Sequence, residues 1–150
     1  MNTTLLGTNL WFSPKLLDAA GEFVQGAILT TGFFPESQWP VVRRFVTRFE
    51  AVYGRKPGFI EAIAYDAARV MLTTVLHPDA WLRAGIRHRL LNLEDEEALT
   101  GRLRFEGNGD SLQALSLLQI RENGFSELDP AAPPVWKPWQ VAVPPPPPAP

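Results

Sequence analysis

The chain has 150 residues, of which 45% are hydrophobic and 20% charged, the ordinary balance of a globular protein with one core. The formal net charge of −2 supplies no basic surface for phosphates, so we expect no nucleic-acid partner. The absence of cysteine excludes disulfides, thiolate metal sites and cysteine nucleophiles. No stretch reaches the roughly 20 apolar residues of a membrane-spanning helix, so we expect no transmembrane segment in this chain.

The first third of the chain predicts a strand, a helix and a second strand. Residues 4–7 form a short apolar run, typical of a buried strand. Ser13-Pro14 predicts the start of a helix over 14–20, because Ser caps free amides and Pro has its φ preset for the first turn. Residues 23–31 (FVQGAILTT) are rich in apolar and β-prone side chains and predict the second strand.

Helices dominate the middle of the chain. Over residues 40–53 the apolar side chains recur at i, i+3, i+4 and i+7, which predicts an amphipathic helix. Residues 59–76 are apolar around much of the helix circumference, so we expect this second helix to be largely buried. A third, more polar helix is expected from Asp79 to Leu91.

The last third predicts β-structure and then a tail. Residues 99–105 alternate in their second half like an edge strand or hairpin arm, and 106–110 form a tight turn. Residues 114–121 predict a further strand, and Asn123-Gly124 predicts a two-residue hairpin turn. From residue 129 a proline-rich segment predicts a disordered or polyproline II tail, more readily solvated than docked in an SH3- or WW-like groove.

This order of elements indicates an α/β fold class, but the strands are too few to cover the helix expected at 59–76. No motif suggests catalysis. His77 and His88 are the only histidines, and neither has a second histidine or an acid at metal-ligand spacing. The chain contains no GxSxG turn and no glycine-rich phosphate loop. We therefore expect no enzyme, no cofactor and no metal site.

The charged residues predict local ion pairs. Asp66 and Arg69 lie three residues apart on one predicted helix and are expected to pair on its solvated face. The acidic run at residues 94–97 is expected to neutralise a group of nearby arginines: Arg83, Arg87, Arg89, Arg102 and Arg104.

Several motifs follow one another in order from about Leu5 to Phe125. They are LLGTN, VQGA at residues 24–27, a helix ending in YGRKP, YDA within the next helix, and LTGRLRFEGNGD. This succession resembles the C-terminal portion of type I periplasmic solute-binding proteins, the leucine/isoleucine/valine-binding or Venus-flytrap family.

The resemblance implies two α/β lobes joined by a three-strand hinge that close on a small ligand. Residues 1–32 would then supply strands and a helix of the second lobe. Residues 33–128 would be mostly first-lobe helices with the terminal hairpin, and 129–150 the tail. The hinge would be crossed near residues 30–34. Because the first residues show no signal peptide, we expect the chain to be part of a longer exported protein of the periplasm or cell envelope.

The resemblance also implies where a ligand would bind. The matching positions are the loop Asn9-Leu10-Trp11 and the start of the helix at 59–76, where Glu61 lies. Amino-acid binders of this family place a carboxylate in that loop to meet the ligand's ammonium group, and here the matching residue is Asn9. Losing the charge removes a strong charge-assisted hydrogen bond. Trp11 either stacks on the ligand or serves as a lid or core residue.

Two functions follow from the resemblance. The first is the ligand-binding component of an ABC importer for an amino acid or related small solute, with the ABC permease as partner. The alternative is an envelope lipoprotein domain that activates penicillin-binding proteins, with a peptidoglycan synthase as partner. The sequence LWFSPKLL and the loop Gly32-Phe33-Phe34-Pro35 are similar to that subgroup, and Asn9 favours it too.

Overall fold

A computed structural model of the chain describes residues 3–78, 80–95, 97–122 and 124–128. The proline-rich tail predicted for residues 129–150 lies outside the described residues. The elements, in chain order, are β1 (Leu6–Gly7), η1 (Asn9–Trp11), α1 (Pro14–Ala20), η2 (Gly21–Val24), β2 (Ile28–Thr31), α2 (Pro40–Tyr53), α3 (Phe59–Val75), α4 (Arg83–Leu91), β3 (Glu94–Asp95), β4 (Leu103–Phe105), β5 (Ser111–Gln113), β6 (Ser116–Arg121) and β7 (Gly124–Glu127).

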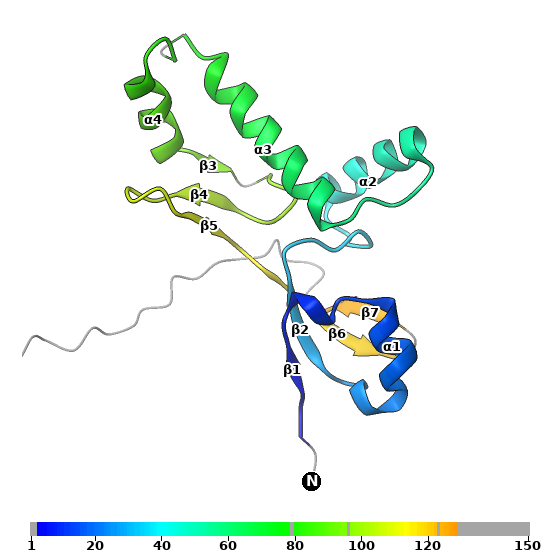
Figure 1. Ribbon diagram of the computed structural model, residues 1–150. Coiled ribbons are helices and arrows are strands. Elements are labelled where there is room, and N and C mark those ends of the chain that lie inside the picture. The colour runs from blue at the N-terminus through cyan, green and yellow to red at the C-terminus, as the bar shows by residue number, and fades with distance from the viewer. Residues whose placement is uncertain (1–2, 79, 96, 123, 129–150) are drawn as a thin grey trace, which may run out of the picture.

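These elements form two bodies (Figure 1). The sheet body holds the strands in the order β1-β2-β6-β7, with η1, α1 and η2. β1 runs parallel to β2, while the β2–β6 and β6–β7 pairs are antiparallel. Apolar side chains of β2 and β6 form its core with Phe34, and α1 packs Leu16 and Leu17 against it.

The helical body holds α2, α3 and α4 with an antiparallel sheet of order β3-β4-β5. α2 packs Val42 and Val46 against Ala62 of α3, as the periodicity of its sequence requires. Gly54, at φ 66°, ends α2 in the left-handed conformation, and its N–H donates to the Glu50 carbonyl at 2.8 Å. A second small core joins Val70 of α3 to Ala98 and to Leu103 of β4.

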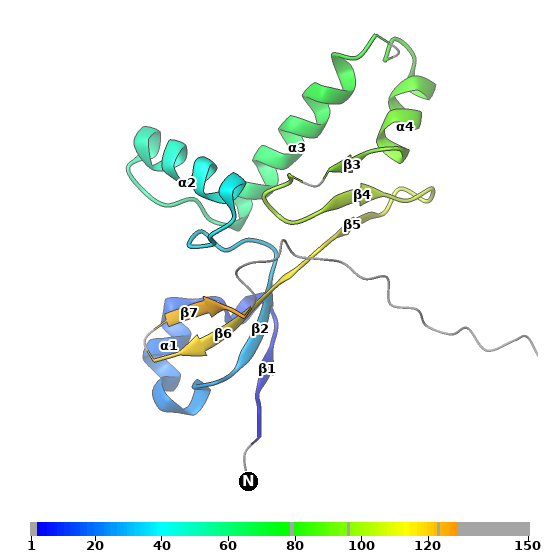
Figure 2. The ribbon, with the colours of Figure 1, turned by 180° about the vertical axis from the view of Figure 1, so that it is seen from behind.

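Over residues 3–128, as far as the structure describes them, the chain crosses between the bodies twice (Figure 2). Residues 32–39 lead from β2 to α2, and Ala114-Leu115 lead back from β5 to β6. The returning strand β6 pairs with β2, so that Ile28 lies opposite Gln119. The terminal hairpin therefore belongs to the sheet body. The expectation of one division near residue 32, with the hairpin grouped with the helices, lacks this second crossing.

The predicted helices agree with the structure more closely than the predicted strands do. The helices expected at 14–20 and 40–53 are confirmed at both ends, and α3 ends one residue early at Val75. α4 begins at Arg83, four residues after the predicted start, and Asp79 itself lies outside the described residues. The Ser13 side chain makes no capping hydrogen bond, contrary to the prediction. A proline in the first turn, a glycine at the C-terminal end and 3.6-residue periodicity are local signals, which explains the agreement.

The strand expected over 23–31 is wrong in its first half. η2 covers Gly21–Val24, and Phe23 is 82% exposed. Gly26 has φ 79°, a left-handed backbone that interrupts the extended chain, so only Ile28–Thr31 pairs as β2. No sequence signal marked the short polar strand β3.

Both hairpins predicted in the last third exist. β4 pairs with β5 around the turn at residues 106–110. In the second hairpin Gly124 already pairs with Arg121, so the turn lies one residue earlier than predicted, with Glu122 at φ 47°. Asn123 lies outside the described residues.

The expectation that α3 is largely buried is wrong for the part of the chain described. α3 buries a single stripe against its own body: Ala62, Asp66, Val70 and Thr74. A second apolar stripe on the same helix, here called the open face of α3, is exposed at Ile60 (74%), Met71 (56%) and Val75 (46%). Nothing among the described residues packs on this face. No described helix is both long and apolar enough to span a membrane.

Candidate functional site

Three of the residues expected to bind a ligand form η1, directly after β1. The carboxyl ends of parallel strands are where open α/β sheets bind ligands, and η1 lies at that end of β1. Asn9 is exposed and Leu10 is 84% exposed. Trp11 is half-buried and packs on Gly7, where an added Cβ would lie 2.5 Å from the indole ring. Part of Trp11 therefore serves the core, as one of the two alternatives expected.

Glu61, the fourth expected residue, lies in the first turn of α3. One carboxylate oxygen accepts the Gly58 N–H at 2.9 Å, which is the glutamate half of a capping box because the glycine N-cap has no side chain to return a bond, and the other accepts from the Arg55 guanidinium at 2.5 Å. The guanidinium also lies over the Phe49 ring, 5.2 Å from its centroid. The Arg55 bond, followed by the backbone amide bonds, lowers the pKa of Glu61. Both oxygens are thus engaged within the chain.

The structure does not bring these four residues into one contact. η1 belongs to the sheet body and Glu61 to the helical body. Both nevertheless border the same crossing segment. η1 packs beside β2, and the Phe59 ring at the start of α3 lies against Gly32, where a Cβ would be 2.6 Å from it. The crossing between the two bodies therefore runs between the two candidate patches.

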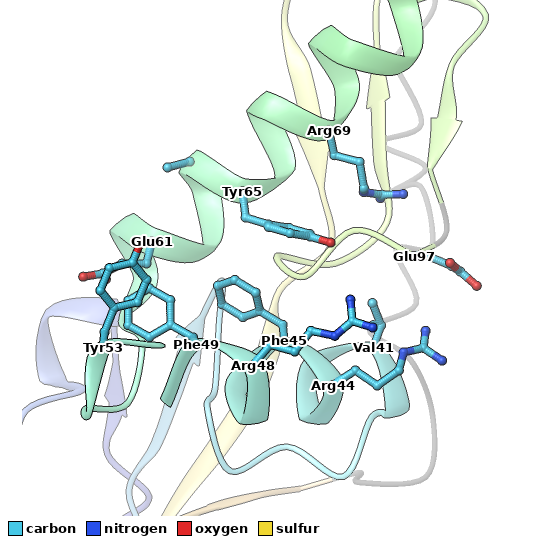
Figure 3. Close-up of a pocket in the computed structure, with 11 residues that line it drawn as sticks. Val41, Arg44, Phe45, Arg48, Phe49, Tyr53, Glu61, Tyr65, Arg69 and Glu97 are labelled. Atoms are coloured by element: carbon cyan, nitrogen blue, oxygen red, sulfur yellow. The ribbon is translucent and has the colours of Figure 1, made fainter. Parts of the chain in front are cut away.

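A cavity of about 560 Å³ lies between α2 and α3 (Figure 3). Its aromatic lining comes from Phe45, Phe49 and Tyr53 of α2 and Tyr65 of α3, with the Phe45 and Tyr65 rings 4.9 Å apart. Arg44, Arg48, Arg69, Glu61 and Glu97 supply the charged groups around it. The sequence predicted that these aromatic side chains belong to the apolar face of an amphipathic helix, but it did not predict a cavity beside them.

The predicted pairing of Asp66 with Arg69 is wrong. Asp66 is 2% exposed, and its carboxylate accepts the backbone N–H groups of Leu99 and Thr100, each at 2.9 Å, and the Thr100 hydroxyl at 2.8 Å. Arg69 instead forms an ion pair with Asp95 of β3. Asp66 faces the loop before β4 and not solvent, because it lies on the buried stripe of α3.

The expected neutralisation around residues 94–97 is confirmed for Arg102. Arg102 pairs with Glu94 at 3.1 Å. Arg104 lies 3.8 Å from Glu106, and Arg87 donates to the Gly107 carbonyl at 3.2 Å. Within the described ranges, no three His, Asp or Glu side chains are grouped closely enough to hold a metal ion.

The aromatic loop after β2 is internal. Phe33 is 2% exposed and Phe34 is 7% exposed, since each packs into the core of a body. Phe33 and Phe34 therefore present no aromatic surface to a protein partner.

Comparison with known proteins identifies the family. The model of the periplasmic binding protein family matches residues 2–124. No curated protein gives a significant match. Among solved structures, the chain is similar to a putative branched-chain amino acid ABC transporter protein from Rhodospirillum rubrum. The two are 30% identical with a TM-score of 0.78 over 85% of this chain and 38% of that one.

Two further structures agree. An ABC transporter substrate-binding protein from Desulfitobacterium hafniense, solved in complex with Leu, is 25% identical with a TM-score of 0.62, over 85% of this chain and 36% of that one. A leucine-binding protein from Thermotoga maritima is 23% identical with the same TM-score, over 85% and 37% of the two chains.

The chain thus spans less than two-fifths of the length of these binding proteins. Its two α/β bodies, joined by crossing segments, have the architecture of a part of a two-lobed binding fold. The chain belongs to the periplasmic binding protein family.

Proposed function

We propose that the chain is part of a periplasmic solute-binding protein that delivers an amino acid or related small solute to an ABC importer. The observation that carries this proposal is the 30% identity to the Rhodospirillum rubrum protein over 85% of the chain. The described fold supports it, because the helices and strands that pack extensively on one another lie within one body or the other and crossing segments join the two, as in a hinged receptor.

The proposed ligand contacts are Asn9, Leu10 and Trp11, with Glu61 at the start of α3. Asn9 offers an exposed amide that can donate and accept hydrogen bonds, and Leu10 offers apolar contact. Glu61 acts by capping and orienting the start of α3, since both its oxygens are already engaged. Because the Asn9 amide is uncharged, it favours a solute whose group in contact with Asn9 is uncharged as well.

The open face of α3 fits the same proposal. A helix that is apolar on two faces is ordinarily buried on both, and burial of each exposed aliphatic side chain is favourable by roughly 1.5–3 kcal/mol. The relatives are more than twice as long as this chain. We therefore assign the open face to contact with a first-lobe sheet supplied by the remainder of the binding-protein fold.

Thermal unfolding of the full-length gene product against a panel of amino acids and small organic acids tests the function. A bound solute raises the Tm by mass action, by an amount that grows with its concentration. Asn9→Ala is expected to reduce this rise while leaving the Tm without solute unchanged. Asn108→Ala, at an exposed turn of the helical body, is the matched control. A panel that produces no rise at all would remove the proposal's main support.

The penicillin-binding protein activator alternative rests on Asn9 and on the similarity of LWFSPKLL and of the Gly32-Phe33-Phe34-Pro35 loop to that subgroup, although Phe33 and Phe34 are buried and offer a partner no aromatic surface. Capture of a glycan-polymerising enzyme by the full-length protein, together with no solute-dependent change in Tm, would favour that alternative over transport.

A further inference from the structure

The loop between β2 and α2, residues 32–39, anchors its side chains alternately in the two bodies. Phe33 packs in the core of the helical body, with its ring centroid 6.1 Å from that of Phe45. Phe34, the next residue, packs in the core of the sheet body, 5.9 Å from the Phe12 ring. Two neighbouring side chains are thus held by opposite bodies, as the alternation of an extended chain allows.

Polar contacts of Glu36 and Ser37 again connect neighbouring residues to opposite bodies. Glu36 pairs with Lys56, which follows α2 in the helical body, at 2.7 Å. Ser37 is 7% exposed, and its hydroxyl donates to Glu127 of β7 in the sheet body at 3.1 Å. The Ser37 oxygen also accepts the N–H of Trp39, the residue that precedes α2, at 3.3 Å. Ser37 therefore connects β7 to the first turn of the helical body.

The two polar contacts differ in strength. Both side chains of the Glu36–Lys56 pair are about half exposed, and such surface pairs contribute little to stability. The Ser37–Glu127 bond is partly buried, and a hydrogen bond to a carboxylate is stronger than one between neutral groups. Burial raises the pKa of Glu127, and the bonds from Ser37 and the Gln38 amide act against that rise. Glu127 therefore depends on this loop for its donors.

Among the described helices and strands, every pair that packs extensively lies within one body. The second crossing, Ala114-Leu115, is a single segment between β5 and β6. Bodies joined in this way move relative to one another unless specific contacts hold them.

We propose that residues 32–39 form a two-sided clasp, and that the Ser37–Glu127 hydrogen bond is the contact that sets the angle between the sheet body and the helical body. Ser37 and Glu127 are positioning residues in this arrangement. The clasp requires no ligand, so its test is independent of the proposed transport function.

The test measures the distance between the bodies directly. Because the chain has no cysteine, Asp18→Cys on α1 and Thr47→Cys on α2, both exposed positions, accept spin labels for pulsed electron–electron distance measurement on the full chain. Ser37→Ala and Glu127→Ala are compared in this background with Glu127→Gln, which retains an acceptor oxygen. Ser126→Ala is the control, because it removes a hydroxyl of β7 that bonds only within the sheet body.

Ser37→Ala and Glu127→Ala are expected to broaden the distance distribution and displace its mean, while Glu127→Gln and Ser126→Ala keep the parent distribution. The Trp39 amide should exchange with solvent roughly two- to tenfold faster in Ser37→Ala, as the loss of one hydrogen bond predicts. Far-UV circular dichroism checks that each variant folds. If Glu127→Ala does not fold, Ser37→Ala, which deletes one oxygen, still tests the proposal. An unchanged distribution in Ser37→Ala, or equal broadening in Ser126→Ala, would overturn the proposal.

Discussion

Replacement of Asp66 by alanine tests the internal contact that most differs from its sequence expectation. The substitution removes the acceptor for two buried backbone N–H groups, those of Leu99 and Thr100. Each unsatisfied buried donor costs about 1–3 kcal/mol. The Thr100 hydroxyl also loses a partner but still accepts from Gln113. We expect the free energy of unfolding to fall by about 3 kcal/mol, a large part of the roughly 5–15 kcal/mol typical of domains.

Urea unfolding, followed by both tryptophan fluorescence and far-UV circular dichroism, measures this change, and coincident curves justify a two-state treatment. Asp66→Asn keeps one acceptor oxygen and should lose less, about 1–2 kcal/mol. Asp18→Ala, at an exposed position of α1, is the control and should stay within about 0.5 kcal/mol of the parent. A loss below about 1 kcal/mol for Asp66→Ala, with an unchanged m-value, would refute the reasoning.

Three further predictions concern other parts of the chain. Because burial raises the pKa of Glu127, its proton is held more tightly in the folded state, so the unfolding free energy falls as pH rises from about 4.3 through the folded pKa. Glu127→Gln should flatten that part of a Tm-against-pH profile, and an unaltered slope would contradict this. Gly7→Ala places a Cβ 2.5 Å from the Trp11 ring and should cost about 1–3 kcal/mol in urea unfolding; a cost near zero would show that Trp11 is loosely held. Met71→Gln on the open face of α3 should reduce binding of the dye ANS and self-association in sedimentation while changing the unfolding free energy by at most about 0.5 kcal/mol. Unchanged dye binding would locate the apolar surface elsewhere.

Much of the candidate site followed from the order of motifs, but its chemistry did not. The resemblance selected Asn9, Leu10, Trp11 and Glu61 by position alone. Glu61 lies three residues after Gly58, where its carboxylate can accept the N-cap amide, and this local signal explains why Glu61 bonds within the chain. No comparable signal marks Trp11, whose contact with Gly7 depends on the turn between β1 and η1. The α2–α3 cavity depends on how two helices cross, which the sequence of either helix does not specify.

The sequence by itself determined the helices at 14–20 and 40–53 and the α/β class, because prolines in the first turn, glycine ends and 3.6-residue periodicity act within a few residues. Only the tertiary structure decided the contacts between distant segments. Asp66 meets Leu99 and Thr100 across 33 and 34 residues, and Ser37 meets Glu127 across 90. Such pairs share no local pattern, since they depend on how the chain returns through its two crossings.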